Sequence, residues 1–144
     1  MSTESPAASG FVERAQPESL RGRALMASLT VNDLQKSLAW YRDVIGFFVS
    51  QQYEFEGELR AVRLTAGIVH LLINQDNGAK GWDRKKGEGI SLTLTTAQDI
   101  DAIAGRIKAR GGTLESEPAD MPWGARIFRV KDPDGFILAI SSEM

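Results

Sequence analysis

The sequence repeats one pattern of secondary structure twice, and this repeat restricts the possible folds more than any other feature. Each copy has one strand, one helix and three further strands. The first copy is predicted at residues 24–31, 32–46, 47–55, 60–65 and 68–74, and the second at residues 90–95, 96–112, 113–117, 125–131 and 136–141. A unit that occurs twice indicates two similar half-sheets related by an approximate twofold axis. We therefore predict an α+β fold made of two β-α-β-β-β modules.

Both predicted helices carry signals at their ends. Asn32 is a good N-cap with Gln35 three residues later, and Gly46 can adopt the left-handed conformation that ends a helix. Thr96 and Asp99 form a capping-box pattern in the second copy. Apolar residues recur at helical spacing, which predicts one buried face on each helix. These residues are Leu34, Leu38, Tyr41 and Ile45 in the first helix, and Ile100, Ile103, Ala104 and Ile107 in the second.

The stretch "VKDPDGFILAIS" predicts a tight turn that leads into the last strand. Asp132, Pro133, Asp134 and Gly135 suit a type I turn, because proline presets φ at the second position. Side chains alternate across a strand, so the strand that follows has two different faces. One face carries Phe136, Leu138 and Ile140, and the other carries Ile137, Ala139 and Ser141. If this second face lines a cleft, its small residues leave room for a ligand.

The composition excludes several classes of protein. The chain has no cysteine, which rules out disulfides, thiolate nucleophiles and zinc bound by sulfur. Its 17 basic and 19 acidic residues give a net charge of -2, so no electrostatic feature favours nucleic acid or a membrane surface as a partner. No secretory signal and no apolar run long enough to cross a bilayer is present. We expect a cytoplasmic protein with a small-molecule partner.

The chain is long enough for one domain with a sizeable core. Residues 1–22 are rich in small, charged and turn-forming residues, which predicts a flexible N-terminal tail. Residues 23–144 then form the domain, with module one at 23–75, a linker at 76–88 and module two at 89–142.

The linker is polar and rich in glycine, so its basic residues Arg84, Lys85 and Lys86 are predicted to be solvated. Trp82 lies in the same segment. A tryptophan in a polar loop usually anchors the loop to the protein body, but it can also cover a pocket mouth or form a subunit contact.

The stretches "LTVNDLQKSLAWYRDVIGF" and "PWGARIFRVKDPDGFILAI" resemble the vicinal oxygen chelate superfamily. This superfamily includes glyoxalase I, extradiol dioxygenases, fosfomycin resistance enzymes and bleomycin-binding resistance proteins. The resemblance covers about residues 24–142. It implies curled mixed sheets around a cleft and a homodimer. It does not specify the activity, because one scaffold supports many chemistries.

Metal-dependent members of the superfamily carry ligands on the first and last strands of each module. By resemblance to the glyoxalase pattern, the four ligand positions fall at Ala27, His70, near Ser91, and at Ala139. Alanine cannot bind a metal, and His70 is the only histidine of the chain. A non-haem iron centre needs two histidines and a carboxylate. We therefore expect no metal, no cofactor and no catalytic residue, unless subunits share ligands.

His70 has three open interpretations. Its imidazole could be satisfied by a backbone carbonyl or water, could contact a ligand, or could serve as a catalytic base or residual metal ligand. Alternation places Val69, Leu71 and Ile73 toward the helices, which leaves His70 with Ile68, Leu72 and Asn74 on the cleft side. A mostly apolar face with a few polar groups suits a ligand site.

The segment "MPWGARIF" resembles a Pro-Trp-Gly stretch of metal-free bleomycin-type resistance proteins. Trp123 offers a flat surface for stacking, although it could instead seal the end of a strand. Arg63 and Arg126 could pair with an anionic ligand.

The leading hypothesis is a metal-independent protein that binds a small amphipathic or aromatic molecule, as drug-sequestering resistance proteins do. The residues predicted to bind this ligand are His70, Trp123, Ser91, Asn74, Ala27, Ala139, Leu72 and Arg63. The alternative is a glyoxalase-like lyase or isomerase whose metal is held by His70 and by donors that the sequence does not identify, which a second subunit could supply.

Overall fold

The computed structural model describes residues 20–143, and its first module forms one four-stranded sheet, called sheet A here. The strands are β1 (Ala27–Val31), β2 (Phe48–Phe55), β3 (Glu58–Ala66) and β4 (Val69–Gln75). Their order is β1-β4-β3-β2. β1 runs parallel to β4, and the other neighbours are antiparallel. Sheet A is therefore a mixed sheet.

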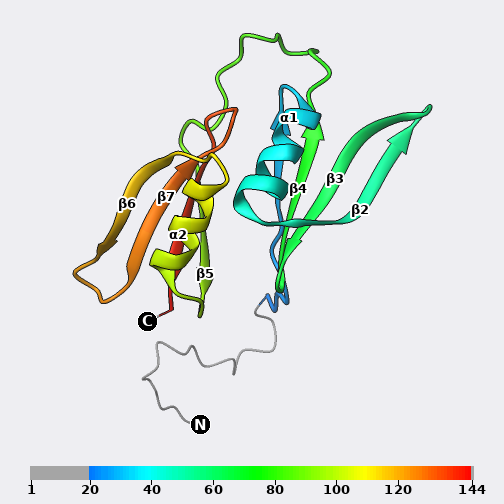
Figure 1. The fold of residues 1–144 in the computed structure, drawn as a ribbon. Helices are drawn as coiled ribbons and strands as arrows, with labels where there is room; N and C mark the ends of the chain where they lie inside the picture. Colours follow the sequence, from blue (N-terminus) through cyan, green and yellow to red (C-terminus); the bar gives the residue numbers. More distant parts are fainter. Residues whose placement is uncertain (1–19, 144) are drawn as a thin grey trace.

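The second module repeats this topology in a second sheet, called sheet B. Its strands are β5 (Ser91–Thr96), β6 (Leu114–Asp120), β7 (Arg126–Lys131) and β8 (Ile137–Ser142). They follow the order β5-β8-β7-β6, again with one parallel pair. Two mixed sheets of identical topology, each with its own helix, confirm the predicted fold of two β-α-β-β-β modules (Figure 1). The predicted tail lies outside the described residues except for its last three positions.

The helices begin and end close to the predicted positions. In module one α1 (Leu34–Ala39) continues directly into a wider π-helical turn, η1 (Trp40–Ile45), and Gly46 ends it at φ 112°. In module two the helix is α2 (Ile100–Ala109). The predicted caps Asn32 and Thr96 are wrong, because the side chains that accept the N-terminal N–H groups are Asp33 and Asp99.

One hydrophobic core joins the two modules on the sides of the sheets that face the helices. Strands of both sheets and both helices contribute to it: Leu29, Val31, Val62, Leu64, Leu71, Ile73, Phe128, Val130, Leu138, Ile140, Leu34, Leu38, Tyr41, Ile100, Ile103, Ala104 and Ile107 are buried there. The C-terminal ends of the two helical segments also touch, because a Cβ on Gly112 would lie 2.6 Å from Val44. Each sheet therefore has one face covered by its helix and one uncovered face.

A polar contact links α1 to the turn between β7 and β8. Tyr41 donates a 2.8 Å hydrogen bond from Oη to Oδ2 of Asp132, and Ser37 donates to Asp134 over 3.3 Å. Oδ1 of Asp132 accepts the N–H groups of Asp134 and Phe136, and Gly135 N donates to Asp132 O, as the predicted turn requires. Burial raises the pKa of the Asp132 carboxyl. This contact fixes how module one meets module two.

The linker is held to the protein body by a buried ion pair. Nζ of Lys86 lies 2.7 Å from Oδ2 of Asp76, and both side chains are buried, so the prediction of a solvated Lys86 is wrong. Lys86 and the N–H of Gly78 lower the pKa of Asp76. Trp82 lies over Gly78 within the linker itself, with 57% of its surface exposed. The arginine and lysine before Lys86 are exposed as predicted.

Candidate functional site

The uncovered face of sheet A carries a chain of hydrogen-bonded polar side chains around His70. Thr65 and His70 are cross-strand partners, and Oγ1 of Thr65 lies 2.9 Å from Nδ1 of His70. Thr65 also contacts Oγ of Ser50 over 2.8 Å, and Ser50 donates to the carbonyl of Arg63. Nε of Arg63 donates to the same serine oxygen over 3.2 Å. Three strands therefore contribute to one polar network.

This network fixes the proton positions on the histidine. The single hydroxyl proton of Ser50 goes to the Arg63 carbonyl, so Thr65 must donate to Ser50. Oγ1 of Thr65 then has only lone pairs left for His70, and Nδ1 of the neutral imidazole must carry its proton. Nε2 of His70 is thus an acceptor, and the side chain is exposed. A ligand donor, or a cation, can reach it from solvent.

Leu72 and Asn74 extend this face along β4. They pair with Arg63 and Ala61 of β3, so they share the face of the network. Asn74 donates a 2.7 Å hydrogen bond to Ser28 on β1. Leu71 and Ile73 point to the core, as the alternation predicted.

Ala27 does not share this face, which corrects the predicted site. It is the register partner of Leu71 and packs against the main core, since Ala27, Leu29 and Val31 have the same parity in β1. The residue of β1 on the uncovered face is Ser28. Ala27 therefore cannot leave space for a ligand beside His70.

The uncovered face of sheet B is hollowed. A hollow of about 660 Å³ lies over β5, β8 and β7, and its lining is Thr93, Thr95, Trp123, Ala125, Ile127, Arg129, Ala139, Ser141, Ser142 and Glu143. Ala139 is buried against Ala125 and Ile127 at its base, while Trp123 is 59% exposed. The small side chains at the base, with the indole ring of Trp123 beside them, leave room for a planar ligand.

The remaining polar residues differ in whether they line the hollow and in whether their side chains are already paired. Ser91 is on the face of Ala139, because it leads β5 two residues before Thr93, but it does not line the hollow. Arg126 already pairs with Asp101 at 2.9 Å and with Asp120 at 3.0 Å, so it is not free to hold an anion. Arg129 lines the hollow and makes no side-chain hydrogen bond or ion pair within the described residues.

The predicted ligand residues are thus on two different sheets. His70, Arg63, Leu72 and Asn74 are on sheet A, whereas Trp123, Ala139 and Ser91 are on sheet B. Sequence reasoning missed the hydroxyl groups of Ser50, Thr65, Thr93 and Thr95. The threonines have the same strand parity as Arg63 and Ser91, so alternation was a usable signal. Alternation could not have predicted the position of Ser50, because a register shift lies between Val49 and Gln51.

The donor set does not fit a divalent metal centre within one chain. Among residues 20–143 no three His, Asp or Glu side chains converge on one point. The uncovered faces offer hydroxyls, guanidinium groups and a single imidazole, with Glu143 at the edge of the hollow. A divalent ion requires several converging oxygen or nitrogen donors.

Among residues 20–143, no helix is long and apolar enough to cross a membrane.

The paired modules and their uncovered faces define a class of cleft-forming β-α-β-β-β proteins, and the comparisons specify the family. Residues 23–140 match the profile of the Glyoxalase/Bleomycin resistance protein/Dioxygenase superfamily. The chain belongs to this superfamily, as its resemblance predicted.

Individual relatives agree with this assignment. The chain is 29% identical over 126 residues to a probable lactoylglutathione lyase of Vibrio cholerae, covering 82% of this chain and 88% of the relative. It is 29% identical over 123 residues to the lactoylglutathione lyase of Salmonella typhimurium, covering 79% and 87%. A superfamily member from Sphaerobacter thermophilus has a similar structure, with a TM-score of 0.67, 27% identity and coverage of 85% and 98%.

Proposed function

We propose that this protein binds a small amphipathic or aromatic molecule without a metal, on the uncovered faces of its sheets. The observation that supports this proposal is the position of Ala139 at the base of the sheet B hollow, where the resemblance to the glyoxalase pattern implies a glutamate. A methyl group there supplies space and no charge. Trp123 would stack on a planar part of the ligand, while Thr93 and Arg129 would contact its polar groups.

We further propose that the site is completed by a homodimer. His70 and Trp123 are on different sheets, and neither uncovered face has a cover within the described part of the chain. A twofold pair in which sheet A of one protomer faces sheet B of its partner would bring both residues to one ligand. His70 would then accept a hydrogen bond at Nε2, with Ser91 and Asn74 orienting the guest at the margin. Drug sequestration is one use of such a site.

The first experiment compares Trp82 and Trp123, which are 57% and 59% exposed. A panel of planar antibiotics and metabolites is screened by thermal shift, because a ligand at a hundred times its dissociation constant adds about 2.7 kcal/mol of stability. For any hit, Trp123→Ala should abolish the shift and Trp82→Ala should preserve it, since only Trp123 borders the hollow. Equal effects of the two changes would remove the hollow from the proposal.

The histidine is tested separately by substitution. For any hit, His70→Ala should weaken binding, because it removes the exposed acceptor Nε2. An unchanged affinity would show that the imidazole does not contact the ligand.

The alternative is a glyoxalase-like lyase or isomerase, and the names of the curated relatives favour it. It needs a metal held by His70 and by donors of a second subunit. Metal analysis of protein purified without chelator distinguishes the two functions. Stoichiometric nickel or zinc that is lost in His70→Ala, together with lactoylglutathione lyase activity, would replace the binding proposal.

A further inference from the structure

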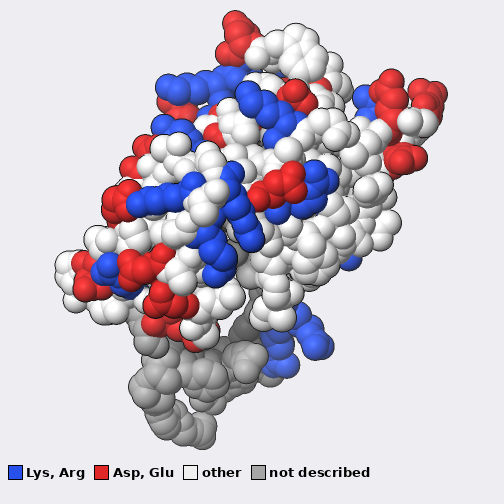
Figure 2. All heavy atoms as spheres, in the orientation of Figure 1, with Lys and Arg blue, Asp and Glu red and all other residues white. Residues whose placement is uncertain are grey.

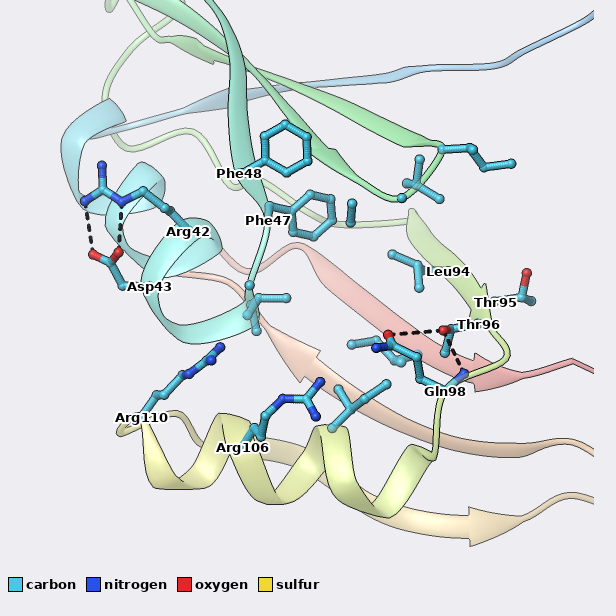
Figure 3. Close-up of a pocket in the computed structure, with 18 residues that line it drawn as sticks. Arg42, Asp43, Phe47, Phe48, Leu94, Thr95, Thr96, Gln98, Arg106 and Arg110 are labelled. Carbon is cyan, nitrogen blue, oxygen red and sulfur yellow. Dashed lines mark hydrogen bonds and ion pairs between the residues drawn. The ribbon is translucent and has the colours of Figure 1, made fainter.

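A second pocket lies between the two modules, on the side of the helices. It has a volume of about 750 Å³ and is walled by η1, the start of β2, the β3–β4 turn, β5 and α2 (Figure 3). Thr95 is the one residue that it shares with the sheet B hollow. It is therefore a separate cavity from the proposed ligand site.

The charged groups that line this pocket leave two uncompensated arginines. The ionisable lining residues are Arg42, Asp43, Arg106 and Arg110. Arg42 forms a two-pronged pair with Asp43 at 2.8 and 3.0 Å, so these two charges cancel. Arg106 and Arg110 make no ion pair or side-chain hydrogen bond with any described residue. The pocket therefore has an excess of two positive charges.

The two guanidinium groups are positioned to act together. Arg106 and Arg110 are four residues apart at the end of α2, so they project from one helix face. Figure 3 shows both side chains directed from α2 toward the pocket. Figure 2, in the orientation of Figure 1, shows several lysine and arginine side chains gathered near the centre of that face of the molecule. Nη1 of Arg110 also lies close to Gly46, where a Cβ would be 3.5 Å away.

The opposite wall of the pocket is apolar and partly exposed. Phe48 is 56% exposed and Ile68, at the tip of the β3–β4 turn, is 94% exposed. Phe47, Val69 and Leu94 continue this wall toward the core. Large exposed apolar side chains opposite free guanidinium groups suit a ligand with an anionic end and an apolar body.

We propose that this inter-module pocket binds a small amphipathic anion. Its carboxylate, phosphate or sulfonate group is held by Arg106 and Arg110, since planar guanidinium groups bind such oxyanions with paired hydrogen bonds. Its aromatic or branched apolar body lies against Phe48 and Ile68. The volume is within the range of sites for drug-sized molecules. The site is independent of the proposed function and does not need a second subunit.

The test uses two probes with the same aromatic body and different charge. 1-Anilinonaphthalene-8-sulfonate is anionic, and N-phenyl-1-naphthylamine is its neutral counterpart. Both are titrated by fluorescence into the full-length chain. The double variant Arg106→Gln/Arg110→Gln should weaken binding of the sulfonate at least tenfold and change binding of the amine less than twofold. Phe48→Ala should weaken both probes at least threefold.

The matched control is Arg60→Gln/Lys80→Gln, which removes two positive charges from residues outside the pocket. It should change the affinity of neither probe by more than twofold. Equal sulfonate affinities in the two double variants would overturn the proposal. A change of oligomeric state in Arg106→Gln/Arg110→Gln, measured as the molar mass in solution, would also overturn it. The arginines would then belong to a contact between protein chains.

Discussion

Two glycines of the linker allow a controlled test of how the linker connects the modules. Gly87 and Gly89 have nearly the same positive φ, 78° and 77°. A Cβ on Gly87 would lie 2.4 Å from the carbonyl oxygen of Gly135, in the β7–β8 turn. A Cβ on Gly89 would have no atom within 4 Å. Alanine at either position therefore incurs the strain of a positive φ, but only Gly87→Ala also displaces a neighbouring segment.

The expected magnitudes follow from this geometry. A left-handed conformation costs a non-glycine residue about 1–2 kcal/mol, and this cost is common to both changes. An ordinary Cβ contact begins at 3.4 Å, so Gly87→Ala requires backbone atoms to separate by about 1 Å. Overpacking of this kind typically costs about 1–3 kcal/mol. We expect Gly89→Ala to lower the free energy of unfolding by about 1–2 kcal/mol and Gly87→Ala by about 2–5 kcal/mol.

Urea unfolding of the two variants and the wild type measures this difference. Because both changes replace glycine by alanine, the loss of conformational entropy in the unfolded chain cancels between them. A difference of 1 kcal/mol would appear as a shift of roughly 3–5 °C in Tm for a domain of this size. Equal free energies of unfolding for Gly87→Ala and Gly89→Ala would refute the tight contact between linker and turn.

Three further predictions concern the buried polar groups. Tyr41→Phe removes the hydrogen bond to Asp132 and should lower the free energy of unfolding by about 2 kcal/mol in denaturant titrations. An unchanged free energy of unfolding would mean that the carboxylate has found another donor. Burial raises the pKa of Asp132, so its contribution to stability falls as pH rises from about 4 through its folded-state value. The stability of wild type relative to Asp132→Asn should therefore be greater at pH 4 than at pH 7, and a difference independent of pH would contradict this. Lys86→Met leaves Asp76 buried without its cation, which should lower Tm at pH 7, and the deficit should shrink below about pH 4 as the carboxylate is protonated.

The order of elements could be predicted because local signals agree with the tertiary fold. Alternation in β4 and β8 gave the correct faces for His70 and Ala139, and the predicted turn at Asp132 has its expected hydrogen bond. The N-caps failed by only a few residues, since Asn32 and Asp33 are both suitable caps and the backbone decides between them. Local sequence thus determines where an element is, but less exactly where it begins.

The errors in the site have a different origin. Ala27 was placed by its distance from Val31, although the shared parity of these residues already assigns them to one face. Lys86 was predicted to be solvated because nothing local indicates that Asp76, ten residues away, closes a buried pair with it. The pocket with Arg106 and Arg110 was not predicted at all, since its walls come from both modules. These features depend on contacts between segments, which a single sequence does not contain.

The separation of covered and uncovered sheet faces explains how the fold can persist while its chemistry changes. The main core uses only the helix-facing sides of the strands, and no residue of the His70 network belongs to it. Exchanging a metal-ligating side chain for alanine on an uncovered face therefore costs little core packing. Sheet B differs from sheet A in that its uncovered face has a small cluster of its own, in which Ala139 is buried with Ala125 and Ile127. Ala139 places no ionisable side chain at the base of the hollow, and its cross-strand partner is Arg129, which lines the same hollow. Under the proposed function, Trp123 and Arg129 are therefore the side chains expected to determine what the hollow binds.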